Sequence, residues 1–524
     1  MKKKIIVLIL SAFMILSIFV GCDQPATVTT DDNVKDEVYD DKEQKQSNDE
    51  TNEEDKNDTD DESKDEEKTN DETTDKDSEK DSNNSSDGVV KAYVTLSSLS
   101  IRNTPDYDNS KVLGAVAKGQ EVIVLDEIKD PNHDILWYQI KLEDKQDNLD
   151  RYISAKYTTK NKEDLSNSSA YNYLNFDKSL DFEPIDKVKE YENNPRVEAK
   201  GVFLTRTSGQ STKKVDELIA LANRTNINTF VIDIKDDDGK MLFESKTVEE
   251  IVPEANSHAR DIEYAKELIK KLKENDIYVI GRVVSFKDPQ YARTHPNTII
   301  RYKSGEPFIN SKVKWTTPYN RDLWKYIIGV SKEAAELGFN EIQFDYVRFP
   351  ASNGGKLDKH LDYQNKLNES KALAIQNFLK EARKELSPMG VYISADVFGL
   401  VPSVRDDMGI GQHWEAISNY VDIISPMIYP SHYARGTYGV PIPDANPYKT
   451  VYECTLDSVE RNENIKTPAV VRPWIQDFTA TWVKGYINYG PKELEAQIKA
   501  LEDAGVNEYL LWNAGNNYTE GGIR

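Results

Sequence analysis

Short apolar runs alternate with longer stretches of helical spacing from about residue 196 to the end of the chain. The runs are rich in valine, isoleucine and phenylalanine, which is typical of parallel strands buried on both faces. Eight runs predict strands, at 199–205, 229–234, 277–284, 341–344, 391–397, 422–425, 469–471 and 508–511. The stretches between them predict helices at 213–224, 261–275, 322–337, 369–386, 412–419, 447–461 and 491–504.

Eight strands that alternate with helices favour an α/β fold, a (β/α)8 TIM-like barrel over residues 180–524. An open doubly wound sheet is the alternative. The chain ends 13 residues after the last predicted strand, which leaves no room for a full eighth helix. We expect residues 182–195 to cover that gap from the N-terminal side.

Residues 89–160 follow a different pattern of short apolar or alternating runs. Turn signals at 104–105, 118–119 and 130–131 separate these runs, which predicts a small all-β barrel. The order Leu-Ser-Ile-Arg, Lys-Gly, Trp-Tyr and Tyr-Ile-Ser resembles a bacterial SH3 domain, although Arg-Tyr-Ile at 151–153 replaces the usual Gly-Trp-Val. The resemblance implies docking on cell-wall peptide or glycan, and the residues leave a simple spacer role open.

The N-terminus carries the features of an export signal. Three lysines at 2–4 precede an apolar run at 5–20, which is shorter than the roughly 20 residues of a spanning helix. The following glycine and Cys22 resemble a bacterial lipobox, which predicts a lipoprotein signal peptide at 1–21 and diacylglycerol on Cys22. A plain secretory peptide is the alternative. We therefore expect a lipid-anchored protein on the extracellular face of the cell membrane, associated with the cell wall.

The net charge of −24 is concentrated near the N-terminus. Residues 24–87 hold 26 acidic and 8 basic residues, a surplus of 18 negative charges, with almost no apolar side chain. Such a composition predicts a disordered acidic linker over residues 22–88, which like charges extend into a tether. The remainder is mildly acidic and has no basic stripe, so we expect no nucleic-acid partner.

Cysteine and histidine usage predicts neither a disulfide nor a metal site. Cys454 is the only cysteine besides Cys22, so lipidation of Cys22 leaves it unpaired. The six histidines form no His-x-His or His-Glu-x-x-His pattern, and Asp-Asp-Asp-Gly at 236–239 lacks the later glutamate of an EF-hand. We expect no metal and no cofactor.

Three aspartates end predicted strands, where a (β/α)8 barrel builds its site. Asp345 and Asp396 end neighbouring strands about 4.8 Å apart, so their carboxyl groups are expected to approach the roughly 5–5.5 Å of retaining glycosidases. We assign Asp345 as nucleophile and Asp396 as general acid/base. Asp233 is a third candidate, which either binds sugar hydroxyls or replaces one of the pair. The alternative is a structural role in loop capping or ion pairing.

Other polar and aromatic side chains near the strand ends are candidates for substrate binding. Arginines beside the acids would hold one carboxylate ionised, and aromatic rings offer flat faces for sugar C–H groups. Ordinary rim packing is the alternative for each ring. The candidates are Asp233, Lys235, Arg282, Tyr346, Arg348, Tyr429, Trp474 and Trp512.

Five blocks of the sequence resemble a known family. They are GVFLT at 201–205, FVIDIKD at 230–236, FDYVRFP at 344–350, SADVFG at 394–399 and LWNA at 511–514. Together they resemble the glycosyl hydrolase-like domain family of bacterial surface lipoproteins, long catalogued as a domain of unknown function. The resemblance runs from about residue 198 to the end. It implies a TIM barrel akin to α-amylase-like glycosidases and glycan hydrolysis by carboxylates at the fourth and fifth strands, here Asp345 and Asp396.

Two functions follow from these patterns. The first is a membrane-anchored glycoside hydrolase that cleaves a cell-wall or extracellular polysaccharide, such as peptidoglycan, by a two-carboxylate, retaining mechanism. The second is a non-catalytic surface protein that binds glycan or cell wall. The presence of both strand-end carboxylates favours the enzyme.

Overall fold

The structure is a computed structural model, and it describes residues 90–523 except 96–97, 107–109, 130–134, 143–148 and 166–172. The predicted signal peptide, Cys22 and the whole acidic linker lie outside the described residues and stay predictions. No helix in the described part of the chain is long and apolar enough to cross a membrane.

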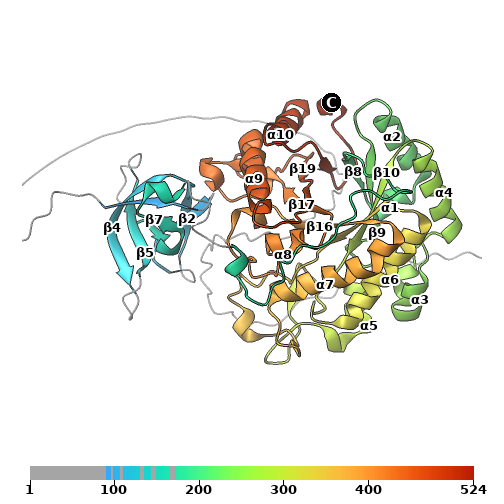
Figure 1. Ribbon diagram of the computed structural model, residues 1–524, viewed down its shortest axis with the longest axis horizontal. Helices are drawn as coiled ribbons and strands as arrows, with labels where there is room; N and C mark the ends of the chain where they lie inside the picture. Colours follow the sequence, from blue (N-terminus) through green and yellow to red (C-terminus); the bar gives the residue numbers. More distant parts are fainter. Residues whose placement is uncertain are drawn as a thin grey trace, which may run out of the picture. The chain divides into compact units, whose positions relative to one another are not determined.

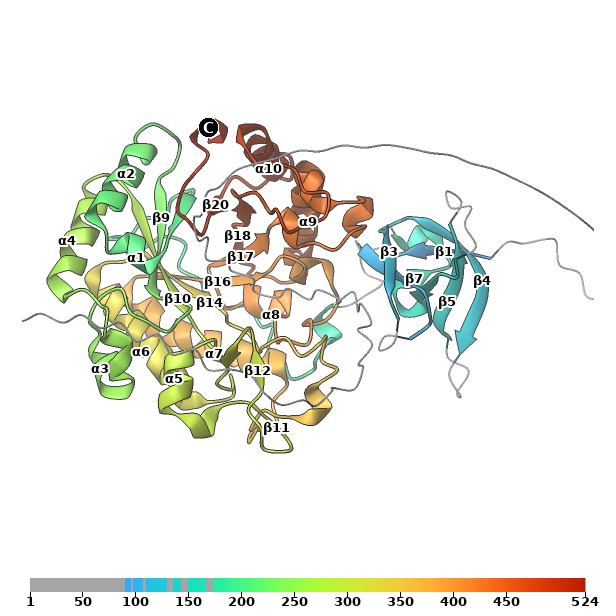
Figure 2. The same ribbon diagram turned by 180° about the vertical axis from the view of Figure 1, so that it is seen from behind.

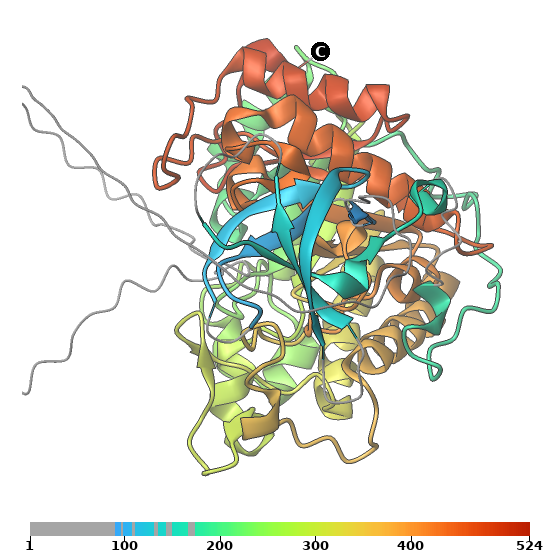
Figure 3. The same ribbon diagram turned by 90° about the vertical axis from the view of Figure 1, so that its left-hand side faces the viewer.

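The N-terminal domain is the predicted small β-barrel, an antiparallel sheet in the order β3-β2-β6-β5-β4-β1-β7 (Figure 3). Apolar side chains alternate inward, and Val94, Ile101, Val122 and Ile153 form its core. The strands are β1 (Lys91–Val94), β2 (Ser98–Arg102), β3 (Val112–Ala117), β4 (Glu121–Lys129), β5 (Ile135–Lys141), β6 (Tyr152–Ser154) and β7 (Thr158–Thr159).

The C-terminal domain is a closed barrel of parallel strands, which confirms the predicted fold (Figure 1). The last strand pairs with the first, with Tyr509 opposite Lys200, and this pairing closes the wall. The wall consists of β8 (Lys200–Leu204), β9 (Thr229–Lys235), β10 (Tyr278–Val284), β14 (Glu341–Asp345), β16 (Tyr392–Phe398), β17 (Ile423–Ile428), β18 (Val470–Val471) with β19 (Trp474–Gln476), and β20 (Tyr509–Trp512).

Amphipathic helices surround this wall and bury their apolar faces against it (Figure 1). Side-chain caps set several of their starts, as where Asn320 accepts the Asp322 N–H at 2.9 Å, and Gly338, with φ 98°, ends the same helix. The main helices are α2 (Thr212–Ala222), α4 (Ile262–Lys273), α6 (Arg321–Leu337), α7 (Lys371–Leu386), α8 (Trp414–Ser418), α9 (Pro447–Asn462) and α10 (Pro491–Asp503). Shorter helices are α1 (Arg206–Gly209), α3 (Lys246–Ile251) and α5 (Pro289–Thr294).

The seventh strand is longer than predicted and is broken in the middle. The sequence predicted a strand at 469–471, but the wall resumes as β19 after Arg472 and Pro473. Proline has no N–H to donate to a neighbouring strand, so the ladder is interrupted there. The carboxyl end of this strand is therefore Gln476, not Val471.

The expectation for residues 182–195 was wrong. This segment crosses the amino ends of the strands and forms a floor: the Asn194 side chain donates to the carbonyls of Asn340 (2.7 Å) and Gly390 (2.9 Å), just before β14 and β16. The gap beside β20 is covered by the C-terminal tail, where η13 (Glu520–Gly522) packs on α10 and Glu520 pairs with Arg224 at 2.8 Å.

Candidate active site

Strand alternation places the two predicted catalytic aspartates inside the barrel at one level. On β14, Ile342 and Phe344 face the helices, so Asp345 faces inward. The register pairs Phe344 with Ala395, and the next residue on each strand is Asp345 or Asp396. Both side chains are buried, with exposed fractions of 5% for Asp345 and 1% for Asp396.

Arg282 on β10 binds the acids together. Its Nη1 donates to Asp233 Oδ1 at 2.6 Å, and its Nε and Nη2 donate to Asp345 Oδ2 at 2.9 and 2.5 Å. Asp237, in the loop after β9, lies 3.5 Å from Nη2. One buried guanidinium therefore contacts three carboxylates, and two of its N–H groups converge on a single oxygen of Asp345 in charge-assisted hydrogen bonds.

Asp396 has a different environment, with the indole of Trp474 donating to Oδ1 at 2.8 Å. Burial raises the pKa of Asp396 well above its ordinary value, and the negative charge of Asp345 raises it further. Arg282 and the Trp474 hydrogen bond oppose this shift only in part. Burial likewise raises the pKa of Asp233 to about 7, against the attraction of Arg282. In both groups, the environment favours the protonated form of the carboxyl group.

The residue after Asp345 has a strained backbone. Tyr346 has φ 48°, in the left-handed region that a bulky side chain rarely adopts, and its N–H donates to Asp345 Oδ1 at 2.6 Å. Its hydroxyl accepts from Lys287 Nζ at 2.9 Å. Lys287 was not predicted from the sequence; its position three residues beyond β10 was the available signal.

The two other predicted cations have different surroundings. Lys235 forms a fully buried ion pair with Asp288 (2.9 Å) and donates to the Val284 carbonyl. Lys235 is the last residue of β9, and its contacts with Asp288 and Val284 hold it within the barrel wall. Arg348 is buried with its guanidinium over the rings of Phe398 (4.5 Å) and Trp315 (4.9 Å).

The three predicted rings do not all lie at the rim. Trp512 is partly exposed, stacks on Phe203 with centroids 4.2 Å apart, and lies 6.3 Å from Tyr429. Trp474 is only 1% exposed and lies inside the barrel, because the seventh strand resumes after Pro473. Trp474 therefore contacts Asp396 from within and does not offer an open face to a sugar.

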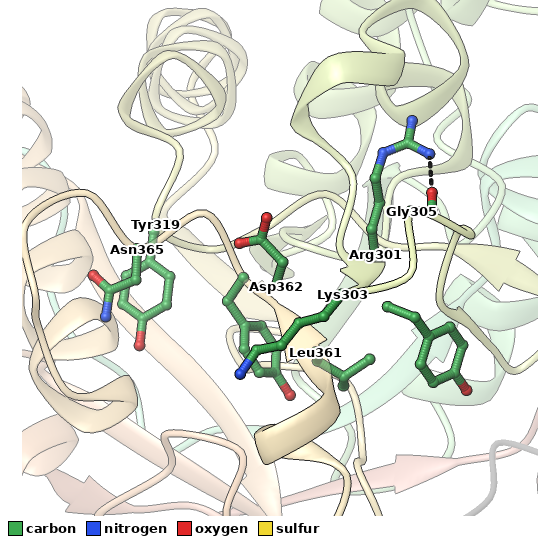
Figure 4. A pocket seen from close by; sticks show the side chains of 9 residues that line it. Arg301, Lys303, Gly305, Tyr319, Leu361, Asp362 and Asn365 are labelled. Carbon is green, nitrogen blue, oxygen red and sulfur yellow. Dashed lines mark hydrogen bonds between the residues drawn. The ribbon is translucent and has the colours of Figure 1, made fainter.

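A cavity of about 570 Å³ lies in the loops that follow β10 and β14 (Figure 4). The short strands β11 (Arg301–Tyr302) and β15 (Leu361–Asp362) pair beside it, near the hairpin of β12 (Ile309–Asn310) and β13 (Val313–Lys314). None of the predicted site residues lines it. Its lining is Arg301, Tyr302, Lys303, Gly305, Tyr319, Leu361, Asp362, Tyr363 and Asn365.

Within the described residues, no group of three or more histidine, cysteine or acidic side chains is arranged to hold a metal ion. The chemistry that the cluster itself offers is that of neighbouring carboxyl groups with unlike partners, Arg282 for Asp345 and Trp474 for Asp396. Such a pair can supply an acid and an anion near neutral pH.

Solved structures with similar folds include several glycosidases. A hypothetical protein from Ruminiclostridium thermocellum is 39% identical, covering 37% of this chain and 97% of that chain, with a TM-score of 0.33. The glycoside hydrolase domain of PgaB from Bordetella bronchiseptica is 12% identical, covering 61% and 94%, with a TM-score of 0.42. An α-galactosidase from Thermus thermophilus is 11% identical, covering 81% and 84%, with a TM-score of 0.41.

Comparison with curated proteins gives no match. Family models match both domains: residues 97–159 match the bacterial SH3 domain, and residues 201–518 match the model described as "Putative glycosyl hydrolase domain". The second match spans more than half of the chain and contains all three site aspartates. The chain therefore belongs to this glycosyl hydrolase domain family, with a bacterial SH3 domain preceding the barrel.

Proposed function

We propose that the protein is a lipid-anchored glycoside hydrolase that cleaves a cell-wall or extracellular polysaccharide, with Asp345 as nucleophile and Asp396 as general acid/base. The observation that supports this proposal is the in-register pair of buried aspartates with unlike partners. Asp345 accepts two hydrogen bonds from Arg282, whereas burial and Asp345 raise the pKa of Asp396. One group is thereby suited to attack carbon and the other to donate a proton.

The reaction would proceed in two displacements. Asp345 attacks the anomeric carbon while Asp396 gives its proton to the departing glycosidic oxygen, so that a glycosyl ester forms and one sugar leaves. Asp396, now ionised, takes a proton from water, the water oxygen attacks the same carbon, and the Asp345 carboxylate is released. Arg282 would stabilise that returning negative charge. Asp233, with its pKa raised to about 7, would donate a hydrogen bond to a sugar hydroxyl.

A surface protein that binds glycan without cleaving it is the second candidate. The observation in its favour is the tight pairing of Asp345 with Arg282 and its exposed fraction of only 5%. A carboxylate in such a pair can serve the fold alone.

The decisive experiment compares the purified full chain with Asp345→Asn and Asp396→Asn on a panel of polysaccharides that includes peptidoglycan, with new reducing ends as the readout. Asp322→Asn, an exposed acid on α6 in an ion pair with Lys325, is the matched control. We expect each site variant to lose at least about 10³-fold in kcat/KM, and Asp322→Asn to match the wild type. Equal product release from wild type and both site variants would reject the assignment. Glycan binding by all of them with release by none would favour the binding protein.

The location forms a separate part of the proposal and rests on the sequence. The basic residues at 2–4, the apolar run at 5–20 and Cys22 support cleavage and lipidation. Cys22→Ser should abolish incorporation of labelled fatty acid and move the protein from the membrane fraction to the supernatant. Unchanged labelling would exclude Cys22 as the site.

A further inference from the structure

A strip of aromatic rings leads outward from Trp512 at the carboxyl end of β20. Tyr429, just after β17, lies 6.3 Å from Trp512 and 6.1 Å from Phe478, centroid to centroid. Phe478 and Trp482, both in the loop after β19, stack with centroids 6.1 Å apart and planes 18° apart. We call these four side chains the aromatic strip. Its members come from three neighbouring strands of the wall, β17, β19 and β20.

Exposure increases from Tyr429 to the outer end of the aromatic strip. Tyr429 is 7% exposed, Phe478 is half-buried and Trp482 is 46% exposed. Trp482 therefore leaves a large apolar surface in water at the outer end of the strip. Burial of such a surface is favourable, so an exposed tryptophan on a defined platform marks a place where a ligand gains affinity.

The loop that carries Phe478 and Trp482 is anchored by polar contacts. Gln476 Nε2 donates to Asp444 Oδ1 at 3.1 Å and to the Phe478 carbonyl at 3.0 Å. The Tyr489 hydroxyl donates to the Asp444 carbonyl at 3.0 Å, which fixes the far end of the loop. Because the rings are held before any ligand arrives, binding would cost little conformational entropy.

The inner end of the aromatic strip reaches the catalytic cluster. The Arg282 guanidinium, which holds Asp345, lies 5.6 Å from the Trp512 ring. A ligand on the strip would thus be continuous with one at the acids. Phe478 and Trp482, whose planes lie 18° apart, can offer apolar faces to sugar C–H groups, whereas Tyr429 meets Phe478 edge-on, with planes 68° apart.

We propose that Trp512, Phe478 and Trp482 of the aromatic strip form subsites for sugar units of a polymeric glycan, with the buried Tyr429 packed between Trp512 and Phe478 as their support, so that the substrate is a chain of several units. This inference rests on the proposed function, because the strip is assigned to the same substrate that the aspartates cleave. His432, with its ring 6.5 Å from Trp482 and 6.4 Å from Phe478, would contribute a polar edge to the outer subsites.

The test uses Trp482→Ala and Phe478→Ala in the full chain. The matched control is Tyr448→Ala on α9, a 38% exposed ring stacked on Tyr452 at 5.8 Å and outside the strip. The readouts are kcat/KM on the polysaccharide that the wild type cleaves and on the shortest oligosaccharide that it still cleaves. We expect each strip variant to lose about three- to tenfold on the polymer, and clearly less on the short substrate. Tyr448→Ala should match the wild type on both. Equal losses on long and short substrates, or no loss, would overturn the proposal.

A binding measurement separates this inference from the proposed function. Affinity electrophoresis of the Asp345→Asn chain through gels that contain peptidoglycan strands or other soluble polysaccharides needs no hydrolysis. We expect retardation that Trp482→Ala, added to Asp345→Asn, weakens and that Tyr448→Ala does not. Trp482-dependent retardation without hydrolysis by the wild type would reject the enzyme and keep the subsites. Hydrolysis with no effect of Trp482→Ala in either assay would support the enzyme and reject the subsites. Failure of every glycan to retard the chain counts against the subsites.

Discussion

The barrel buries charged side chains both at its floor, the amino ends of the strands, and at its mouth, the carboxyl ends. The two ends balance these charges differently. At the floor, Arg472 contacts Glu341 and lies 3.7 Å from Glu508, and Arg196 contacts Glu508. Two arginines thus face two glutamates. At the mouth, the single guanidinium of Arg282 contacts Asp233, Asp237 and Asp345, and Asp396 lies beside them.

The difference separates a structural network from a chemical one. Matched charges in the floor compensate one another, so the cost of burying them is offset within the network. Burial raises the pKa of Asp396 and that of Asp233, and the neighbouring acids, Asp345 and Asp237 respectively, raise them further. Carboxyl groups with shifted pKa values at the open end of a barrel are the usual mark of acid–base chemistry.

The sharpest test removes one negative charge at each end of the same strand, β14, in two separate variants. Asp345→Asn at the mouth should lower kcat by at least about 10³-fold, because the proposed nucleophile is lost. Arg282 keeps Asp233 and Asp237 as partners, so its buried charge stays paired, and the free energy of unfolding should fall by less than the cost of an unpaired buried charge, about 3–5 kcal/mol. Steady-state kinetics and denaturant unfolding of the same preparation measure both quantities.

Glu341→Gln at the floor should show the opposite pattern. It leaves the charge of Arg472 without its closest partner, which should lower the free energy of unfolding by about 3–5 kcal/mol. The folded fraction should retain the kcat of the wild type. A loss of activity without a loss of stability would contradict the contrast between the two ends.

The pH dependence of stability should distinguish the mouth further. The pKa of Asp233 is about 7 in the folded chain and 3.8 ordinarily, so between these values the folded state holds a proton that the unfolded state has lost. Its contribution to stability is present below pH 3.8 and is lost as the pH rises through about 7. In thermal unfolding from pH 4 to 8, the Tm of Asp233→Asn should therefore rise relative to the Tm of the wild type as the pH increases. A constant difference in Tm would reject this account.

Asn194→Ala tests the segment that closes the floor. It removes two hydrogen bonds to the carbonyls of Asn340 and Gly390 and should lower the free energy of unfolding by about 2 kcal/mol. No contact of Asn194 reaches the acids among the hydrogen bonds of the described residues, so kcat should be unaffected. Calorimetry and kinetics check the two halves of this prediction.

Trp474→Phe should have the smallest effect of the five and should act only at the mouth. It removes the indole N–H that donates to Asp396. In the wild type this hydrogen bond lowers the pKa of Asp396, so its loss should raise that pKa. We expect kcat/KM to fall about fivefold, and the limb of the pH–rate profile that belongs to Asp396 to move to higher pH. An unshifted limb would show that this hydrogen bond does not tune the acid.

The eight-stranded barrel could be predicted from the sequence, and so could the position of Asp345 and Asp396 at the same height in the barrel. Buried parallel strands are continuous apolar runs, and alternation along them fixes which side chains face inward, so Asp345 and Asp396 could be placed side by side. The carboxyl end of the seventh strand could not be placed, because β19 is a run of only three residues behind Pro473. Trp474 was therefore expected at the rim and lies inside.

Contacts made by irregular segments were also out of reach. Contacts between side chains far apart in the sequence cannot be predicted from periodicity. Such contacts determine the position of Lys287, of the floor segment at 182–195 and of the cavity beside β11. The aromatic strip falls in the same class, since Phe478 and Trp482 lie in a loop whose conformation is set by Asp444. In Figure 2, β11, which lies beside the cavity, is at the bottom of the barrel domain, and α10 is at its top.

The break in the seventh strand places two tasks within a very short distance. Arg472 neutralises the acids at one end of the barrel, and Trp474, two positions later, reaches the acid at the other. Inserting or deleting a single residue between Arg472 and Trp474 would turn one of these two side chains out of the barrel interior. Either the folding of the chain or the chemistry at the acids would then be impaired. Relatives of this protein should therefore vary in length within the outer loops and keep this short spacer constant.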